Sequence, residues 1–334
     1  MTFAIVGAGA IGAYLGARLA RAGADVVLVA RGPHAAAMRE RGIRVRSIDG
    51  DFEIAPPIAD TLDAVGAADV VILGVKAHSL PAIAPQLPRV LHAGSIVVST
   101  QNGIPWWYFQ NCGGALEGLR LDRLDPDGAV ASAIEPSRVI GMLVYLSADV
   151  PEPGVIHHTH GQRIVLGEPS GERTDRIKHL SEAFVRAGFR APVTTRIREE
   201  IWVKLLGNVA FNPVSALTGS TLEALAQDAD SSRLLRDVMT EAAEVATRLG
   251  LDLPISIEQR LAGAGRVGAH KTSMLQDREA GRPMEVEAIV GAVVEIGERL
   301  GVPMPATRAV YACVKQLDSR LAADRLSHAR TRTA

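Results

Sequence analysis

Three glycines near the start of the chain constrain its fold more than any other feature. Gly7, Gly9 and Gly12 form a G-x-G-x-x-G pattern after the apolar run Phe3–Val6 and at the start of the amphipathic stretch Ile11–Ala22. The first glycine permits a tight turn, and the third lets a helix pack closely on the preceding strand. The order of strand, glycine turn and helix therefore predicts the opening unit of a parallel sheet.

The rest of the first half continues this alternation of apolar runs and helical stretches. Further strands are predicted at 26–30, 69–75, 95–100, 139–146 and 154–167. Several of these runs are apolar throughout, which is typical of strands covered on both faces. The last two indicate an antiparallel extension, in which we expect a turn at Gly161-Gln162. The pattern predicts an α/β, doubly wound sheet.

The second half has a different character, because strand-like runs disappear from about Arg196 and helical periodicity replaces them. A helix is predicted over Pro283–Leu300, where proline suits the first turn and Gly301 suits the exit. Residues 104–137, rich in Gly and Asp, are interpreted as an inserted excursion. The predicted domains are an α/β domain over 1–195, a helical domain over 196–322 and a flexible tail over 323–334.

The glycine turn also has the features of a dinucleotide-binding site. Gly9 lets a pyrophosphate approach the backbone, and the helix start at Ala10 and Ile11 offers free N–H groups to the phosphates. The second strand ends at Arg31, where NAD sites commonly carry a carboxylate for the ribose 2′-hydroxyl. A guanidinium suits the extra 2′-phosphate of NADP(H), which we expect as cofactor; a solvated surface arginine is the alternative.

Polar residues follow two of the predicted strands. Lys76 comes after Val75, and Asn102 comes two residues after the strand that ends at Thr100. Ligands of open α/β sheets bind at the carboxyl ends of the strands, so both residues are candidates for the nicotinamide end of the site. Either one could also be an ordinary loop residue.

A polar stripe occurs inside an apolar helical segment of the second half. Lys204, Asn208 and Asn212 are spaced at i, i+4 and i+8, near one helix face. Such groups are costly to bury without partners, and Pro213 is expected to bend the helix beside Asn212. A stripe that faces water is the alternative. A lysine desolvated between apolar neighbours is expected to have a lowered pKa.

A third group of polar residues surrounds residue 280. Ser273 suits a helix cap, with Gln276 completing a capping box, and Glu285 suits a helix N-terminus. From the residues alone, structural roles for Ser273 and Glu285 are favoured over functional ones.

As an ordered set, these motifs resemble the ketopantoate reductase family over nearly the whole chain. The motifs are Gly7 to Gly12, Arg31, Val75-Lys76-Ala77, Gln101-Asn102-Gly103, Lys204 with Asn208 and Asn212-Pro213, Lys271-x-Ser273-Met274 with Asp277, and Glu285. The resemblance implies a Rossmann-type N-terminal domain and an all-α C-terminal domain like that of 6-phosphogluconate dehydrogenase, with the active site in the cleft between them. It implies NADPH-dependent reduction of a small branched 2-oxo acid, most simply 2-dehydropantoate in pantothenate biosynthesis.

The resemblance also implies residue roles. Lys204 would be the general acid, and Glu285 would bind substrate and orient that lysine. The remaining implied contacts are Asn208, Asn212 and Ser273 with the substrate, and Lys76 and Asn102 with the nicotinamide ribose and the reacting carbonyl. A cation and amide donors near the carbonyl oxygen suit this chemistry, because ketone reduction builds negative charge there.

Two departures from the family pattern leave the substrate open. His270 stands where an amide is expected, and the excursion after Asn102 carries the bulky run Pro105–Phe109. Another 2-oxo acid, or a 3-hydroxy acid or imine handled by a related dehydrogenase, therefore remains as an alternative. A non-catalytic NADP(H)-sensing protein is an alternative of a different class.

Charge and composition exclude several other classes. A net charge of −1 over 334 residues gives no general attraction to nucleic acid or to an anionic membrane. Two cysteines fit a reduced, cytoplasmic setting, and no apolar run is long enough to span a membrane. The cluster His157, His158 and His160 is interpreted as a polar strand surface, with no metal expected. The apolar C-terminal helices leave a homodimer open.

Overall fold

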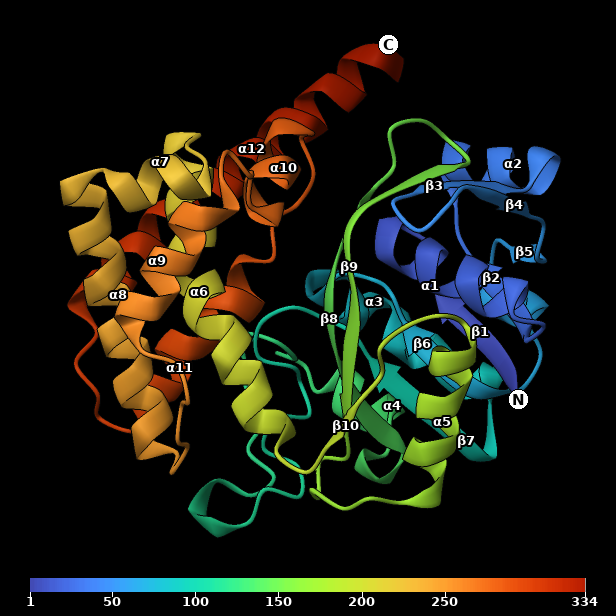
Figure 1. The fold of residues 1–334 in the computed structure, drawn as a ribbon, viewed down its shortest axis with the longest axis horizontal. Helices are drawn as coiled ribbons and strands as arrows, with labels where there is room; N and C mark the ends of the chain where they lie inside the picture. Colours follow the sequence, from blue (N-terminus) through green and yellow to red (C-terminus); the bar gives the residue numbers. More distant parts are fainter. Residues whose placement is uncertain (334) are drawn as a thin grey trace. The chain divides into compact units, whose positions relative to one another are not determined.

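The fold is shown in Figure 1 as a computed structural model, which describes residues 1–333 and the side chains of all of these except 267 and 326–333. The chain forms two compact units. The first contains Met1–Gln101, Pro105–Arg120 and Asp125–Ile197, and the second contains Asn102–Ile104, Leu121–Leu124 and the chain from Arg198 onward. The main transition, after Ile197, lies close to residue 195, where the change of sequence pattern placed the domain boundary.

A sheet forms the first unit. Its strands follow the order β4-β3-β9-β8-β7-β6-β1-β2-β5, with β10 beside β9. Their bounds are β1 (Thr2–Val6), β2 (Asp25–Val29), β3 (Ile43–Ser47), β4 (Phe52–Ile54), β5 (Ile58–Ala59), β6 (Ala68–Leu73), β7 (Leu91–Ser99), β8 (Val139–Asp149), β9 (Val155–Gly167) and β10 (Val193–Thr194). The six neighbouring strands β8, β7, β6, β1, β2 and β5 are parallel to one another. Strand β9 runs antiparallel to β8. This confirms the predicted α/β sheet with an antiparallel extension.

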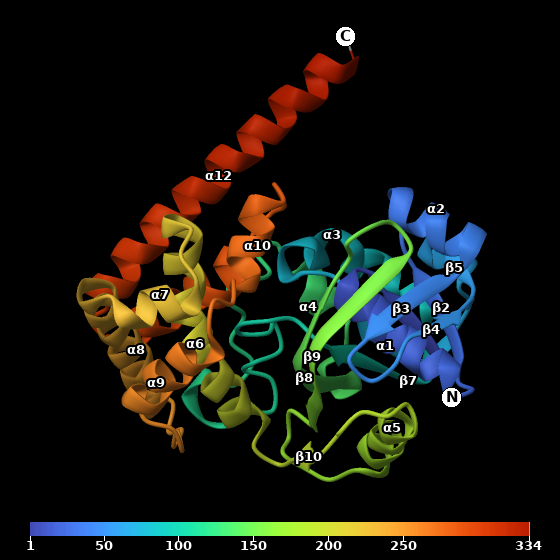
Figure 2. The same cartoon turned by 45° about the horizontal axis from the view of Figure 1, so that its top comes forward.

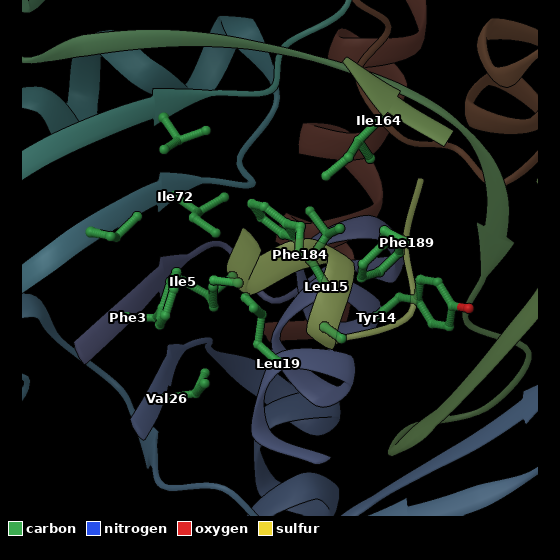
Figure 3. Close-up of a cluster of buried hydrophobic side chains, with 14 of the residues drawn as sticks. Phe3, Ile5, Tyr14, Leu15, Leu19, Val26, Ile72, Ile164, Phe184 and Phe189 are labelled. Atoms are coloured by element: carbon green, nitrogen blue, oxygen red, sulfur yellow. The ribbon is translucent and has the colours of Figure 1, made fainter. Parts of the chain in front are cut away.

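The helices of the first unit are α1 (Ala10–Arg21), α2 (Gly32–Arg41), α3 (Leu80–Ile83), α4 (Ala129–Ala133) and α5 (Asp175–Arg186). Helix α1 packs against the parallel strands β1, β2 and β8 and also against β3 and β9. Its Tyr14 and Leu15 are fully buried, and Figure 3 shows them beside Phe184 of α5 and Phe189. Burial of each such side chain contributes about 1.5–3 kcal/mol, so α1 is a large contributor to the stability of this core.

The antiparallel extension differs from its prediction in where the chain turns. The chain reverses between β8 and β9, at residues 150–154, and β9 runs without interruption through Gly161. Gly161 has a φ of 76°, but it lies opposite a register shift between Tyr145 and Ser147 of β8. The expected turn at Gly161-Gln162 was wrong because the glycine serves a β-bulge, which needs the same backbone conformation.

The histidines of β9 also correct a prediction. His157 and His160 are exposed, whereas His158 is completely buried. The ring of His158 stacks on Tyr14 at 4.4 Å, and its Nδ1 lies 2.8 Å from the Ser47 hydroxyl. A second register shift, between Ser147 and Ala148, puts His158 and His160 in different environments although they are two residues apart.

Helices form the second unit (Figures 1 and 2). They are α6 (Ile197–Thr218), α7 (Leu222–Gln227), α8 (Ala229–Arg248), α9 (Ile257–Val267), α10 (Ser273–Glu279), a short π-helix (Glu287–Gly291), α11 (Ala292–Arg299) and α12 (Pro305–Thr333). Helix α12 continues through the segment predicted as a tail, and residue 334 lies outside the described part. Within the described residues, no helix combines the length and apolarity that a membrane span requires.

The helix predicted over Pro283–Leu300 begins later than expected. Residues 282–285 are not helical, the helical backbone starts at Val286, and its first turn is the π-helix. Pro283 therefore precedes the helix instead of occupying its first turn. The backbone N–H of Arg282 donates to the Asp277 carbonyl at 2.8 Å, and that of Met284 donates to Asp318 Oδ1 at 3.1 Å. These contacts use backbone N–H groups of the segment outside the helix that follows, a constraint that the periodic pattern does not contain.

Candidate active site

A cavity of about 390 Å³ opens at the carboxyl ends of β1 and β2 in the first unit. The residues that line it come from the glycine turn, the end of β2, the segment after β5 and the end of β6: Val6, Gly7, Ala8, Gly9, Val29, Ala30, Arg31, His34, Asp60, Thr61, Leu62, Val75, Ile83 and Gln86. The glycine turn and Arg31, singled out in the sequence, therefore meet in one cavity.

Each glycine of the turn has a different structural reason. Gly7 has a φ of 100°, and a Cβ there would lie 2.5 Å from Val75. A Cβ at Gly12 would lie 2.1 Å from the Gly7 carbonyl oxygen, so helix α1 packs on the strand only without a side chain there. A Cβ at Gly9 would meet no protein atom within 4 Å. The space beside Gly9 is thus open to a ligand, which is what a pyrophosphate needs.

The electrostatics of this cavity favour an anion. Helix α1 begins at Ala10 without a capping side chain and without an acidic residue in its first turn, so its N-terminal N–H groups and partial positive charge are available. Arg31 adds a full positive charge. Asp60 also lines the cavity, but its carboxylate lies 2.7 Å from the guanidinium of Arg39, which offsets its charge. These residues fit the phosphates of a dinucleotide.

The second unit assembles a different group of polar side chains around Lys204 of α6. The Lys204 ammonium donates a hydrogen bond to Asn102 Oδ1 at 2.7 Å. Trp202, Leu205 and Leu206 of the same helix are buried, so apolar side chains surround this lysine in the sequence of α6. Glu285, on the segment before the π-helix, is 9% exposed and interacts with Lys204 through its negative charge.

Burial of the ammonium group lowers the pKa of Lys204 from 10.5 to about 8, and the charge of Glu285 opposes this change. Desolvation is the larger of the two effects, because removing water penalises the charged form more than one carboxylate restores it. The pKa moves in the direction expected from the apolar helix. A lysine of this pKa is still largely protonated at neutral pH and gives up its proton readily, which suits a general acid.

Gln101 is a residue whose role the sequence did not reveal. Its side-chain amide donates to the carbonyl oxygens of Leu73 and Val75 at 2.9 and 3.1 Å, and its Oε1 accepts from the Ser99 hydroxyl at 2.7 Å. Gln101 therefore ties the end of β7 to the end of β6 and fixes the point from which Asn102 leaves the first unit. A glutamine between a strand and a candidate site residue is the only sequence signal of this role.

The remaining site candidates lie on α6 and after β6. On α6, Asn212 is buried and Asn208 is partly buried, so the polar stripe does not face open water, and the helix continues through Pro213. Lys76 follows Val75, which lines the first unit's cavity, but Lys76 does not itself line it.

The structure corrects the predicted cap at Ser273. The residue before α10 is Thr272, whose hydroxyl accepts from the Leu275 N–H at 3.2 Å. Ser273 is the first helical residue and its side chain is exposed. Cap identity depends on the backbone angles of one residue, and Thr272 and Ser273 have similar capping chemistry.

The bulky run after Asn102 packs inside the first unit. Trp107 and Tyr108 are 1% and 2% exposed. The Trp107 ring packs on Gly141, where a Cβ would lie 2.7 Å from a ring carbon. These aromatic side chains fill a core between β8 and the excursion, which gives the excursion a structural role.

Comparison with known families identifies the chain. The model of the family described as "Ketopantoate reductase PanE/ApbA" matches residues 3–171, and that of "Ketopantoate reductase PanE/ApbA C terminal" matches residues 196–318. The chain belongs to the ketopantoate reductase family. It is accordingly an oxidoreductase that acts on a CH–OH group, as the resemblance in the sequence implied.

Individual ketopantoate reductases are similar over almost the full length. The chain is 50% identical to a 2-dehydropantoate 2-reductase of Mesorhizobium japonicum over 319 residues, covering 95% of this chain and 98% of the relative. A putative ketopantoate reductase of Ralstonia solanacearum shares its structure with a TM-score of 0.91 at 38% identity, covering 96% and 98% of the two chains. The structure of the 2-dehydropantoate 2-reductase of Geobacter metallireducens matches with a TM-score of 0.83 at 30% identity, covering 95% of this chain and 99% of the other.

Proposed function

We propose that this protein reduces 2-dehydropantoate to pantoate with NADPH, the reaction that serves pantothenate biosynthesis. The observation that carries the proposal is the hydrogen bond from the Lys204 ammonium to Asn102 Oδ1, at 2.7 Å, with the pKa of Lys204 lowered to about 8. It supports a positioned proton donor in a chain that is 50% identical to a 2-dehydropantoate 2-reductase.

The cofactor follows from the cavity of the first unit. Gly9 leaves space for the pyrophosphate, and the N-terminus of α1 offers it N–H groups. Arg31 at the end of β2 suits the 2′-phosphate, with which a guanidinium forms charge-assisted hydrogen bonds. NADPH, when bound, supplies the hydride. Lys76 and Asn102 are proposed to contact its nicotinamide ribose.

Lys204 supplies the proton in this mechanism. As a hydride reaches C2 of the substrate, the carbonyl π electrons move to oxygen, and Lys204 Nζ transfers its proton there to complete the CH–OH group. The neutral lysine then regains a proton from solvent. A cation close to the oxygen stabilises the charge that develops in the transition state. Glu285 keeps the ammonium charged, because its carboxylate opposes the effect of burial on the Lys204 pKa.

Substrate binding is assigned to Asn102, Asn208, Asn212, Ser273 and Glu285. Asn208 and Asn212 follow Lys204 on α6 at intervals of one turn, so their amides lie on the same side of the helix as the acid. Amide and hydroxyl donors suit the carboxylate and hydroxyl groups of a hydroxylated 2-oxo acid. Asn102 then contacts both the substrate and Lys204, since its Oδ1 already accepts a hydrogen bond from the lysine.

Another 2-oxo acid is the second candidate, because His270 stands where the family pattern has an amide and its side chain is exposed beside α10. The fold is compatible with such a change: a D-mandelate dehydrogenase shares it with a TM-score of 0.82 at 20% identity. That likeness concerns the fold alone.

The test is NADPH oxidation by the purified protein across a panel of 2-oxo acids that includes 2-dehydropantoate, with NADH as the control. Fast, NADPH-selective turnover of 2-dehydropantoate is expected. Turnover of a different 2-oxo acid would keep the acid assignment and replace the substrate, with His270 as the first position to vary. Tight NADPH binding without turnover of any member would favour a cofactor-sensing protein.

A further inference from the structure

A π-helical turn (Glu287–Gly291), called the π-turn below, follows Glu285 almost directly. At its end the Ala292 N–H donates to the carbonyl of Glu287, five residues back. In an α-helix the same N–H would bond to the carbonyl of Ala288, four residues back. The π-turn therefore releases the Ala288 carbonyl from its usual partner inside the helix.

The released carbonyl has a partner from a distant part of the sequence. The backbone N–H of Ile104 donates to the Ala288 oxygen at 2.9 Å. Ile104 is 1% exposed, so this bond forms away from water. A buried N–H without a partner costs about 1–3 kcal/mol, and the π-turn supplies the acceptor that Ile104 requires.

Gly103 brings the two segments into contact. Its φ is 84°, and a Cβ would lie 2.1 Å from the Ala288 oxygen and 2.4 Å from the Ala288 carbonyl carbon. Both the positive φ and the close approach exclude other residues. Gly103 and Ile104 thus seat their segment on the π-turn, and Asn102 is the next residue along the chain.

The shape of the π-turn is itself held by side chains. Tyr311 of α12 donates to Glu287 at 2.9 Å, and the Arg123 guanidinium lies 3.6 Å from the same carboxylate. The Glu287 side chain lies over Gly291, where a Cβ would be 2.2 Å from Glu287 Oε2. A π-turn is a less common geometry than an α-helix and persists where its surroundings stabilise it.

We infer that the π-turn is the positioning element of the proton donor: the Ala288 carbonyl and Gly103 hold Asn102 where its Oδ1 accepts from Lys204. Gly103, Ile104 and Ala288 are positioning residues, which act on the acid through Asn102. The catalytic consequence rests on the proposed function, whereas the placement of Asn102 is independent of the substrate.

The test is Gly103→Ala, with the Lys204 side chain followed by NMR in lysine-labelled protein and its signal assigned with Lys204→Arg. Loss of the acceptor removes a hydrogen bond to the charged form, so the pKa of Lys204 falls below its wild-type value. Asn102→Ala should produce the same fall, and the double variant no further one. The control is Gly263→Ala in α9, where a Cβ meets no atom within 4 Å.

An unchanged Lys204 pKa in folded Gly103→Ala would overturn the inference, as would additive effects in the double variant, because the two changes would then act by separate routes. In steady-state kinetics, Gly103→Ala should lower kcat on the order of 100-fold, as small displacements of catalytic groups do. NADPH affinity should stay close to wild type.

A second measurement covers the case in which Gly103→Ala does not fold. Hydrogen exchange of the wild-type Ile104 amide should be slow, as expected for an N–H bonded to the Ala288 carbonyl. Exchange at the rate of an unprotected amide would overturn the inference without any variant. If the wild-type protein reduced no 2-oxo acid, the proposed function would fail, while the NMR and exchange results would still decide the role of the π-turn.

Discussion

The Lys204 ammonium lies 2.7 Å from Asn102 Oδ1, although 102 positions separate the two residues in the chain. Asn102 follows the end of a strand, and Lys204 lies within a long helix, so each reaches the contact by a different local rule. Their hydrogen bond gives this partly buried cation a defined direction of donation. Substitutions at this pair and in the cavity of the first unit should therefore have separable effects.

Lys204→Ala should lower kcat by about 100-fold to 10,000-fold, because it removes the proton donor. NADPH affinity should change little, since the cavity proposed for the dinucleotide belongs to the first unit. Kinetics with 2-dehydropantoate and fluorescence titration with NADPH measure the two effects. The matched control is Lys178→Ala, at a lysine that is 56% exposed and pairs with Asp175. Normal turnover in Lys204→Ala would remove Lys204 from the mechanism.

Arg31→Glu should weaken NADPH binding by roughly 100-fold or more, because it replaces a charge-assisted hydrogen bond with a repulsive carboxylate. NADH lacks the 2′-phosphate and should lose far less affinity. Dissociation constants of both cofactors check this, with Arg233→Glu as the control at a side chain that is 74% exposed. Equal losses of affinity for NADPH and NADH would show that Arg31 does not bind the 2′-phosphate.

The activity should depend on pH through Lys204. Only the protonated lysine can act as the acid, so kcat should fall as pH rises through about 8, the pKa to which burial lowers this group. Rates at saturating NADPH and substrate between about pH 6 and 10 show the limb. Lys204→Arg stays protonated throughout this range and should lack it. A wild-type profile without a limb near pH 8 would separate Lys204 from the rate-limiting step.

Stability should depend on the same group with a defined sign. The pKa of Lys204 is about 8 in the folded protein and 10.5 in its unperturbed state. Between these values the unfolded chain binds more protons, so the contribution of Lys204 to the free energy of unfolding increases as pH rises through the interval. The total change is on the order of 3 kcal/mol. Denaturant unfolding of wild type and Lys204→Met at several pH values should diverge in this window, and parallel curves would contradict the lowered pKa.

Two glycine substitutions should separate folding from cofactor binding. Gly12→Ala places a Cβ 2.1 Å from the Gly7 oxygen and should cost about 1–3 kcal/mol of unfolding free energy. Gly9→Ala meets no protein atom within 4 Å, so stability should change less while NADPH affinity falls, because the methyl group enters the space for the pyrophosphate. Thermal unfolding and cofactor titration of both variants test the pair. Full NADPH affinity in Gly9→Ala would place the pyrophosphate elsewhere.

Local features of the site were predictable from the sequence. The positive φ at Gly7 and the contact of Gly12 with the Gly7 carbonyl are set within a few residues, so the glycine pattern identified them. The spacing of Lys204, Asn208 and Asn212 likewise placed three side chains near one helix face, because the period of a helix is fixed. The lowered pKa of Lys204 followed from the apolar residues around it on α6.

Features that depend on distant contacts were not predictable in this way. The glycine at 161 indicated a turn, but the register of β8 made it a bulge. The π-turn replaced a regular helix start because Ile104, Arg123 and Tyr311 contact it from elsewhere in the chain. Periodicity describes one segment at a time and contains no information on such partners.

The sequence by itself determined the class of this protein: a glycine turn between strand and helix, an arginine at the end of the second strand, and a lysine on an apolar helix. The tertiary structure alone decided which amide accepts from that lysine and which carbonyl holds the amide in place. The physical reason is that the hydrogen bond between Lys204 and Asn102 joins residues whose local conformations are independent. Folding of the second unit brings Lys204 and Asn102 together. The segment that carries Asn102 rests on the π-turn, whose geometry depends on its own neighbours.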